Sequence, residues 1–130
     1  MKNGENEVKI ELGMVRARAI EFNKLVYGWR MDGLPVPATK ITYVQNEELR
    51  KIKVYPDSIN LYTGIKDRTG QPIFEHDLVN LNSKHGEIIY RNGCFWWECK
   101  EKEPLPMYSF ILHDPAVVGY YYHGMIQDNE

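Results

Sequence analysis

The chain lacks the short motifs on which most enzyme classes depend. Its 130 residues contain neither a GxGxxG loop nor a P-loop, and no Ser or Cys stands in a nucleophile elbow. No apolar run approaches the roughly 20 residues that a bilayer span needs, and the N-terminus, MKNGENEVKIE, has no apolar signal region. We therefore expect a cytoplasmic protein that is not an enzyme, has no catalytic residues and does not enter a membrane.

Excess charge and metal-binding motifs are also absent. Sixteen basic and 18 acidic side chains leave a net charge of −2, so no overall field attracts nucleic acid or an anionic membrane. No histidine belongs to an HxH or HExxH motif, so we expect no metal and no cofactor. The four histidines are His76, His85, His113 and His123.

Cysteines are too few and too poorly spaced to build a cross-link. Cys94 and Cys99 are five residues apart on what we expect to be one strand, which points their side chains to opposite faces. An extended chain separates them by about 16 Å, well beyond the reach of a disulfide. A Cx4C spacing without a second Cys or His pair is also a poor zinc site. We predict two buried free thiols.

What the sequence does contain is the pattern of a mainly β protein with few short helices. Hydrophobic residues make up 43% of the chain and aromatics 12%, which is enough for a core. Val15, Ala17 and Ala19 alternate with arginines at 16 and 18, which predicts a half-buried strand with a charged outer face. Further strands are expected at 25–27, 41–44, 51–55, 87–91, 94–100, 108–112 and 117–122.

Three segments are not expected to be regular strands. Residues 1–13 are mostly polar and are predicted to be a flexible N-terminus. Residues 32–39 hold two prolines and a glycine, which predicts an exposed loop. Residues 46–50 fit either a single helical turn or a wide hairpin loop, and the sequence does not decide between the two.

The strongest hairpin signal is the Asn-Gly pair at 92–93, because these residues suit the two positive-φ positions of a type I′ turn. The two-residue loop fixes the register and places Ile88 opposite Trp97 on one face. Ile89 and Trp96 then face each other on the other side. Because both faces are apolar, the hairpin is either enclosed in the core or exposes a partner surface. Ile89, Trp96 and Trp97 are therefore candidate interface residues, and which Trp points outward stays open.

The segment 61–81, LYTGIKDRTGQPIFEHDLVNL, is structural rather than chemical. Residues 67–70 fit a type I turn, in which the Asp side chain accepts hydrogen bonds from the backbone two residues on. Pro72 cannot donate to a strand ladder, which suggests an edge position or a strand start. Apolar pairs at 73–74 and 78–79 lie on either side of an expected bend.

This segment also carries a family resemblance. YTGIKDRTG at 62–70 followed by IFEHDLV at 73–79 resembles the signature of the YopX family, which are small proteins of bacteriophages and prophages. A looser likeness extends over residues 14–125. His76 stands where the family usually has Gly, and Ile20 where an aromatic residue is common.

The resemblance implies a phage or prophage origin in a bacterial host and self-association, and it brings no catalytic residues. It also implies a small N-terminal β subdomain at 14–57 followed by a C-terminal SH3-like barrel at 58–130. The favoured interpretation is a non-enzymatic protein that acts through protein–protein association, most simply as a homo-oligomer, with another protein partner left open.

The alternative interpretation is a small nucleic-acid-binding module. An aromatic-basic strip of the kind that small barrels use on single strands would be formed by Lys66, Arg68, Lys84, Arg91 and Trp96. Carboxylates between these residues dilute the positive field, and aromatics at alternating strand positions are more often part of a core. Nucleic acid is therefore the second choice of partner.

Overall fold

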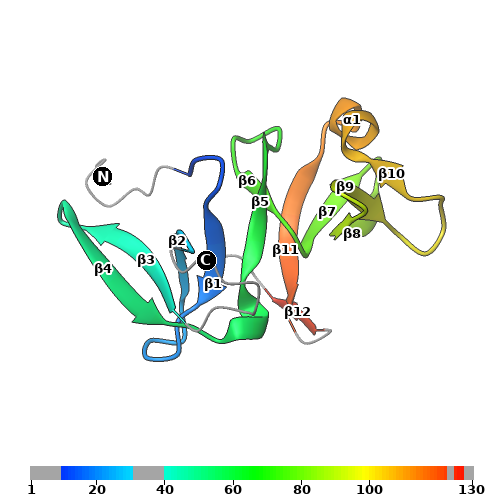
Figure 1. The fold of residues 1–130 in the computed structure, drawn as a ribbon. Helices are drawn as coiled ribbons and strands as arrows, with labels where there is room; N and C mark the ends of the chain where they lie inside the picture. Colours follow the sequence, from blue (N-terminus) through cyan, green and yellow to red (C-terminus); the bar gives the residue numbers. More distant parts are fainter. Residues whose placement is uncertain (1–9, 31–39, 123–124, 128–130) are drawn as a thin grey trace. The chain divides into compact units, whose positions relative to one another are not determined.

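The structure is a computed structural model that describes residues 10–30, 40–122 and 125–127 (Figure 1). The chain divides into two compact units, Met1–Ile59 (unit 1) and Asn60–Glu130 (unit 2). Strands dominate each unit, which confirms the mainly β fold. Most of the expected flexible N-terminus and all of the expected loop at 32–39 lie outside the described residues. In the part that is described, no helix is long and apolar enough to cross a membrane.

Unit 1 is built from two antiparallel hairpins. Its elements are β1 (Val15–Arg18), β2 (Leu25–Gly28), β3 (Lys40–Gln45), β4 (Glu48–Lys53) and the short 3-10 helix η2 (Pro56–Ser58). β1 pairs with β2, and β3 pairs with β4. Isolated bridges between Trp29 and Thr42 and between Ala19 and Val54 join the hairpins. The apolar side chains that they enclose are Val15, Ala17, Ala19, Ile41, Ile52 and Val54.

β2 and β3 approach each other closely at a glycine. A Cβ atom added to Gly28 would lie 2.0 Å from the backbone oxygen of Thr42, which is backbone and cannot move aside. The neighbouring residue, Trp29, exchanges backbone hydrogen bonds of 2.8 and 2.9 Å with Thr42. Only glycine therefore fits at the end of β2.

The expected charged outer face of β1 is wrong. Arg16 is 2% exposed and Arg18 is 9% exposed, so the strand is buried on both faces. The Arg18 side chain donates from Nη1 to the backbone oxygen of Asn23 at 3.0 Å. The backbone N–H of Arg18 donates to Ser58 Oγ at 2.8 Å. The arginines alternate with the apolar residues as expected, but hydrogen bonds allow them to be buried.

Residues 46–50 adopt neither of the two conformations left open by the sequence. β3 and β4 are joined by a tight two-residue turn, in which Asn46 has φ 54° and Glu47 has φ 65°. Two successive positive φ angles are those of a type I′ turn, whose twist matches that of the strands. Asn46 was the available signal, because Asn tolerates the left-handed region better than most residues.

Unit 2 contains a six-stranded antiparallel sheet in the order β10-β9-β8-β7-β11-β12. Its strands are β7 (Asp77–Leu81), β8 (Lys84–Arg91), β9 (Cys94–Glu98), β10 (Leu105–Pro106), β11 (Ala116–Tyr122) and β12 (Met125–Gln127). β5 (Asn60–Lys66) pairs with β6 (Pro72–Phe74), which begins at its proline as expected. The side chains of the core are Ile73, Val79, Leu81, Ile88, Trp97 and Phe110. The SH3-like barrel stays a prediction.

The expected strand at 108–112 is wrong. Here the chain forms the short helix α1 (Met107–Phe110), which continues into the 3-10 helix η3 (Ile111–His113). Phe110 is fully buried, whereas Tyr108 and Leu112 are exposed. Apolar residues at 107, 108, 110, 111 and 112 fit both a strand and a helical turn, and so short a run does not distinguish the two.

The hairpin of β8 and β9 is confirmed in both its turn and its register. Asn92 and Gly93 have φ angles of 56° and 78°. Ile88 pairs with Trp97, and Ile89 pairs with Trp96. Cys94 and Cys99 are free, as expected, but both thiols are half-buried rather than buried.

The turn at 67–70 is confirmed and has a second role. The N–H of Gly70 donates to the backbone oxygen of Asp67 at 2.9 Å, which closes the turn. Asp67 Oδ1 accepts from the N–H of Thr69 at 2.8 Å and from the N–H of Gln71 at 2.9 Å. Its other oxygen, Oδ2, accepts from the N–H of Val117 in β11 at 2.9 Å. One buried carboxylate therefore holds the turn and fixes it to a strand 50 residues away.

Candidate functional site

The outward face of the β8–β9 hairpin is less open than its composition suggests. Ile89 and Trp96 lie opposite each other on this face, and each is half-buried. Trp96 Nε1 donates to the backbone oxygen of Arg91 at 3.1 Å, and the Arg91 guanidinium lies 5.6 Å from the centroid of the indole. Arg91 therefore covers part of the Trp96 ring.

Trp97 belongs to the core of unit 2. It is 1% exposed, and its Nε1 donates to the backbone oxygen of Val79 at 2.9 Å. Its ring packs over Gly86, where an added Cβ would lie 2.5 Å from the indole. Of the three candidate interface residues, Ile89 and Trp96 are thus at the surface, and Trp97 is not.

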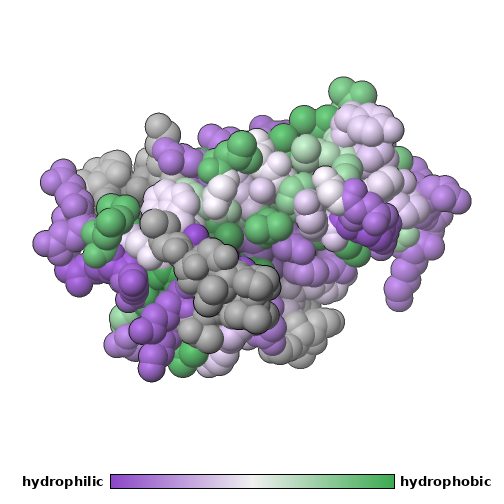
Figure 2. Space-filling model, viewed as in Figure 1, coloured by the Kyte–Doolittle hydropathy of each residue, from purple (hydrophilic) through white to green (hydrophobic). Residues whose placement is uncertain are grey.

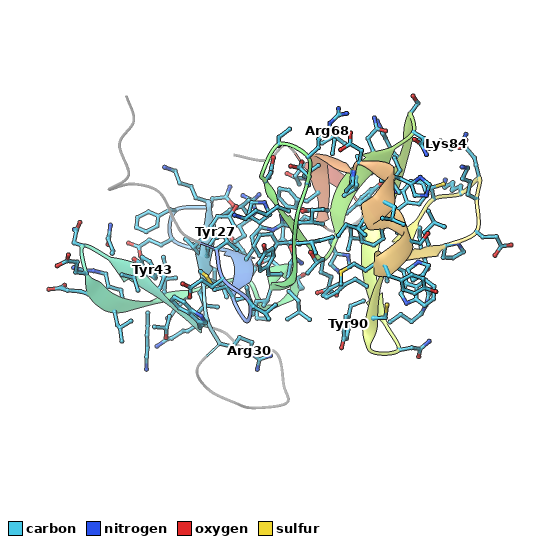
Figure 3. The ribbon with its side chains drawn as sticks, turned by 90° about the horizontal axis from the view of Figure 1, so that it is seen from above. Tyr27, Arg30, Tyr43, Arg68, Lys84 and Tyr90 are labelled. Carbon is cyan, nitrogen blue, oxygen red and sulfur yellow. The ribbon has the colours of Figure 1, made fainter. Side chains whose placement is uncertain are left out.

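The basic residues of the predicted nucleic-acid strip do not converge. Lys84 begins β8 and Arg91 ends it, so their backbones lie about 23 Å apart, and Figure 3 shows Lys84 and Tyr90 at opposite ends of this strand. Arg68 lies in the turn between β5 and β6, and Lys66 ends β5.

Three of these cations also contact carboxylates. Lys84 Nζ lies 3.1 Å from Glu101, Arg68 lies 3.6 Å from Asp114, and Arg91 forms an ion pair with Glu98. Exposed ion pairs contribute little to stability, but they neutralise the field that a polyanion would meet. The positive field that the predicted strip offers to a polyanion is therefore weak.

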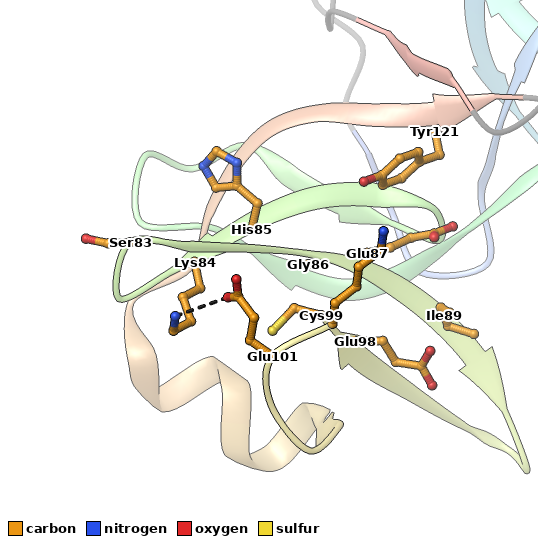
Figure 4. Close-up of a pocket in the computed structure, with 11 residues that line it drawn as sticks. Ser83, Lys84, His85, Gly86, Glu87, Ile89, Glu98, Cys99, Glu101 and Tyr121 are labelled. Atoms are coloured by element: carbon orange, nitrogen blue, oxygen red, sulfur yellow. Dashed lines mark hydrogen bonds and ion pairs between the residues drawn. The ribbon is translucent and has the colours of Figure 1, made fainter.

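An open hollow of about 700 Å³ lies beside this hairpin (Figure 4). Ile89, Glu87 and Tyr121 border it on one side, and the segment that leaves β9 borders it on the other. Glu87 and Glu98 are direct cross-strand neighbours, and His76 Nδ1 lies 2.7 Å from Glu87 Oε2. Among the described residues, no group of three or more His, Cys, Asp or Glu side chains could hold a metal.

A different apolar surface was missed by the sequence interpretation. We call it the α1–η3 patch and define it as Tyr108, Ile111 and Leu112, whose exposed fractions are 78%, 41% and 82%. Residues three and four positions apart lie on the same side of a helical turn, while Phe110 points into the core. Figure 2 shows hydrophobic atoms at the surface over α1. The signal was present in the sequence, but assignment of a strand hid it.

The surroundings of Asp67 alter the acidity of its carboxyl group. Burial raises the pKa of its carboxyl, but hydrogen bonds from Val117, Thr69 and Gln71 outweigh burial and lower the pKa below its ordinary value. The carboxylate is fully engaged by these donors and by the Thr69 hydroxyl at 2.7 Å. Its role is therefore structural.

Comparison with known proteins identifies one family. A family model described as YopX protein matches residues 19–124, which is most of the chain. The comparisons find no match among curated proteins and none among solved structures.

Proposed function

This chain belongs to the YopX protein family, and we propose that it is a non-enzymatic, phage-derived protein of the bacterial cytoplasm that associates with a second copy of itself. The observation that carries the proposal is the α1–η3 patch, where three large apolar side chains are between 41% and 82% exposed. Contiguous apolar surface with a polar border is typical of protein interaction sites.

A second copy suits the patch because its border carries both charges. Arg68 and Asp114 lie 3.6 Å apart, and their side chains are 57% and 70% exposed. Asp114 directly follows η3, so this ion pair adjoins the patch. In a two-fold dimer each patch meets its own copy, which lets Arg68 of one chain face Asp114 of the other.

The expected strength is modest. Burying a large apolar side chain completely contributes about 1.5–3 kcal/mol. Six partly exposed side chains in a two-fold dimer then contribute on the order of 10 kcal/mol, against an association cost of about 4–15 kcal/mol. We therefore expect a dimer that forms at micromolar concentrations rather than a permanent one.

Solution mass as a function of concentration tests the proposal. The wild-type chain should approach twice its 15.3 kDa at high micromolar concentration in light scattering. Leu112→Lys should remain a folded monomer, because a charge at the centre of the interface would be desolvated without a partner. The matched control is Leu12→Lys, since Leu12 is 78% exposed in unit 1 and lies outside the patch.

The outward face of the β8–β9 hairpin is the alternative interface. If Trp96→Lys gives a folded monomer and Leu112→Lys leaves the dimer intact, the interface contains Ile89 and Trp96 instead. A wild-type mass of 15.3 kDa throughout the concentration range would remove self-association altogether.

A further inference from the structure

A group of exposed basic side chains lies on the β3–β4 hairpin in unit 1, outside the basic strip that the sequence predicts. Lys40 is the cross-strand neighbour of Lys53, and Lys51 is two residues from Lys53 along β4. Residues two apart on a strand share a face, and so do direct cross-strand neighbours. The three exposed lysines therefore lie together on one face, which we call the lysine face.

The opposite face of the hairpin contributes two isoleucines to the core of unit 1. Ile41 and Ile52 are cross-strand neighbours that point inward and are 1% and 7% exposed. Arg50 and Glu48 form an ion pair of 3.1 Å on this other face, so Glu48 is engaged there rather than with the lysines. The lysine face is only partly open, because Thr42, the cross-strand neighbour of Lys51, is 6% exposed and is bridged to Trp29, whereas the three lysines themselves are exposed.

No carboxylate compensates the lysine face within the described residues. None of its three lysines takes part in an ion pair there, in contrast to Arg68, Lys84 and Arg91 of unit 2. Like charges placed directly opposite on a sheet are destabilising, and the Lys40–Lys53 pair has this arrangement. A bound polyanion would remove the repulsion.

Unit 1 as a whole also carries a positive net charge. Residues 1–59 hold 10 basic and 8 acidic side chains, and residues 60–130 hold 6 and 10. The small net charge of the chain therefore hides a positive first unit and a negative second one.

We propose that the lysine face binds the phosphate backbone of duplex DNA, with the β3–β4 ribbon lying along the major groove. That groove is about 12 Å wide and admits a two-stranded ribbon. Lys51 and Lys53 are separated by about 7 Å along the strand, and one DNA strand rises about 3.4 Å per phosphate, so each lysine reaches its own phosphate. The inference does not depend on dimer formation through the α1–η3 patch.

The tip of the ribbon favours a groove over a single strand. Val44 and Leu49 are cross-strand neighbours beyond the lysines, and they are 52% and 72% exposed. Short apolar side chains can contact thymine methyl groups in the major groove. Proteins that bind single strands instead stack bases on aromatic rings, and Tyr43, the only aromatic of the hairpin, lies on the opposite face and packs against the core. Because the lysines contact phosphates, their share of the affinity should not depend on sequence.

The test is the salt dependence of binding to a fluorescently labelled 20-base-pair duplex, measured by anisotropy. Three phosphate contacts predict a slope of about −2.7 in log affinity against log salt, or a loss of about 40-fold between 50 and 200 mM. Lys51→Gln with Lys53→Gln should reduce that loss to about 3–4-fold, because one contact remains. The matched control, Lys100→Gln with Lys102→Gln, removes the same charge from exposed lysines of unit 2 and should leave the slope unchanged.

Several results would overturn the inference. It fails if the duplex does not bind at micromolar protein, or if both double variants lower the slope equally, since only net charge would then matter. Tighter binding to a single strand of the same length would contradict docking in a groove. A change in the solution mass of the Lys51 and Lys53 double variant, without a change in DNA affinity, would make the lysine face a contact between copies. As a control, the circular dichroism spectra of both double variants should match that of the wild type, which would show that the substitutions leave the fold intact.

Discussion

Replacing Asp67 by Asn tests the carboxylate that connects the β5–β6 turn with β11. Asn keeps one oxygen, which can still accept from Thr69 and Gln71 at the position of Oδ1. Its amide group replaces Oδ2 and directs N–H toward the N–H of Val117, which now donates at 2.9 Å. Two donors then face each other, and a buried backbone N–H loses its partner.

The expected cost follows from that single lost contact. A hydrogen bond to a charged group contributes about 1.5–3 kcal/mol, and an unsatisfied buried donor costs a similar amount. We expect the free energy of unfolding of Asp67→Asn to fall by about 2–3 kcal/mol, a large part of the 5–15 kcal/mol typical of a domain. Urea denaturation at neutral pH, followed by circular dichroism, measures the difference.

Acid titration distinguishes loss of the carboxylate from a general packing defect. Folding lowers the pKa of Asp67 from its ordinary 3.8, so the unfolded chain binds this proton more readily than the folded one. The stability that Asp67 supplies is therefore fully present above the unfolded value and is lost as pH falls through the lower folded pKa. The difference between the wild type and Asp67→Asn should shrink across that acidic window.

Asp114→Asn is the matched control for this experiment. Asp114 also lies near Arg68 and the β5–β6 turn, but its side chain is 70% exposed and its ion pair is 3.6 Å long. The substitution should cost less than about 0.5 kcal/mol, and Asn tolerates the φ of 55° found at this position. Equal effects of the two substitutions, at every pH, would refute the role assigned to Asp67.

Two further predictions concern backbone positions in unit 2. Gly86→Ala should lower the free energy of unfolding by about 1–3 kcal/mol, because the new methyl group would lie 2.5 Å from the Trp97 ring; an unchanged urea midpoint would contradict this packing. His76 has φ 70°, so His76→Gly should be more stable than His76→Ala by about 1–2 kcal/mol, although both lose the imidazole. A thermal melt in which the Ala variant equals the Gly variant would show that this backbone is not strained.

Local chemistry explains which parts of the fold the sequence predicts. The β8–β9 turn is recognisable because Asn and Gly both suit positive φ. The turns at 46–47 and 82–83 use the same conformation without glycine, and the sequence signal at each is reduced to a single Asn. The helical segment at 107–113 was mistaken for a strand because its apolar residues fit both periodicities.

Burial that depends on distant parts of the chain could not be predicted. The alternation in β1 placed Arg16 on an outer face, and only the fold shows that this face is also covered. Both faces of the β8–β9 hairpin are apolar, so the sequence does not show which of Trp96 and Trp97 is buried. The structure buries Trp97, whose ring packs in the space that Gly86 leaves without a side chain. The lysine face depends on the cross-strand pairing of β3 and β4, which the undecided segment at 46–50 concealed.

The tight turns also determine the order in which unit 2 is expected to fold. β7–β8 and β8–β9 are each closed by two residues, and such local hairpins form in about 1–10 μs. β11 must return to β7 across 36 residues, from Asn80 to Ala116, and the Asp67–Val117 hydrogen bond spans 50. Contacts this distant carry the largest loop-closure entropy and are expected to form late. A chain without the Asp67 carboxylate should therefore fold at nearly the wild-type rate and unfold faster, which a chevron plot of Asp67→Asn would show.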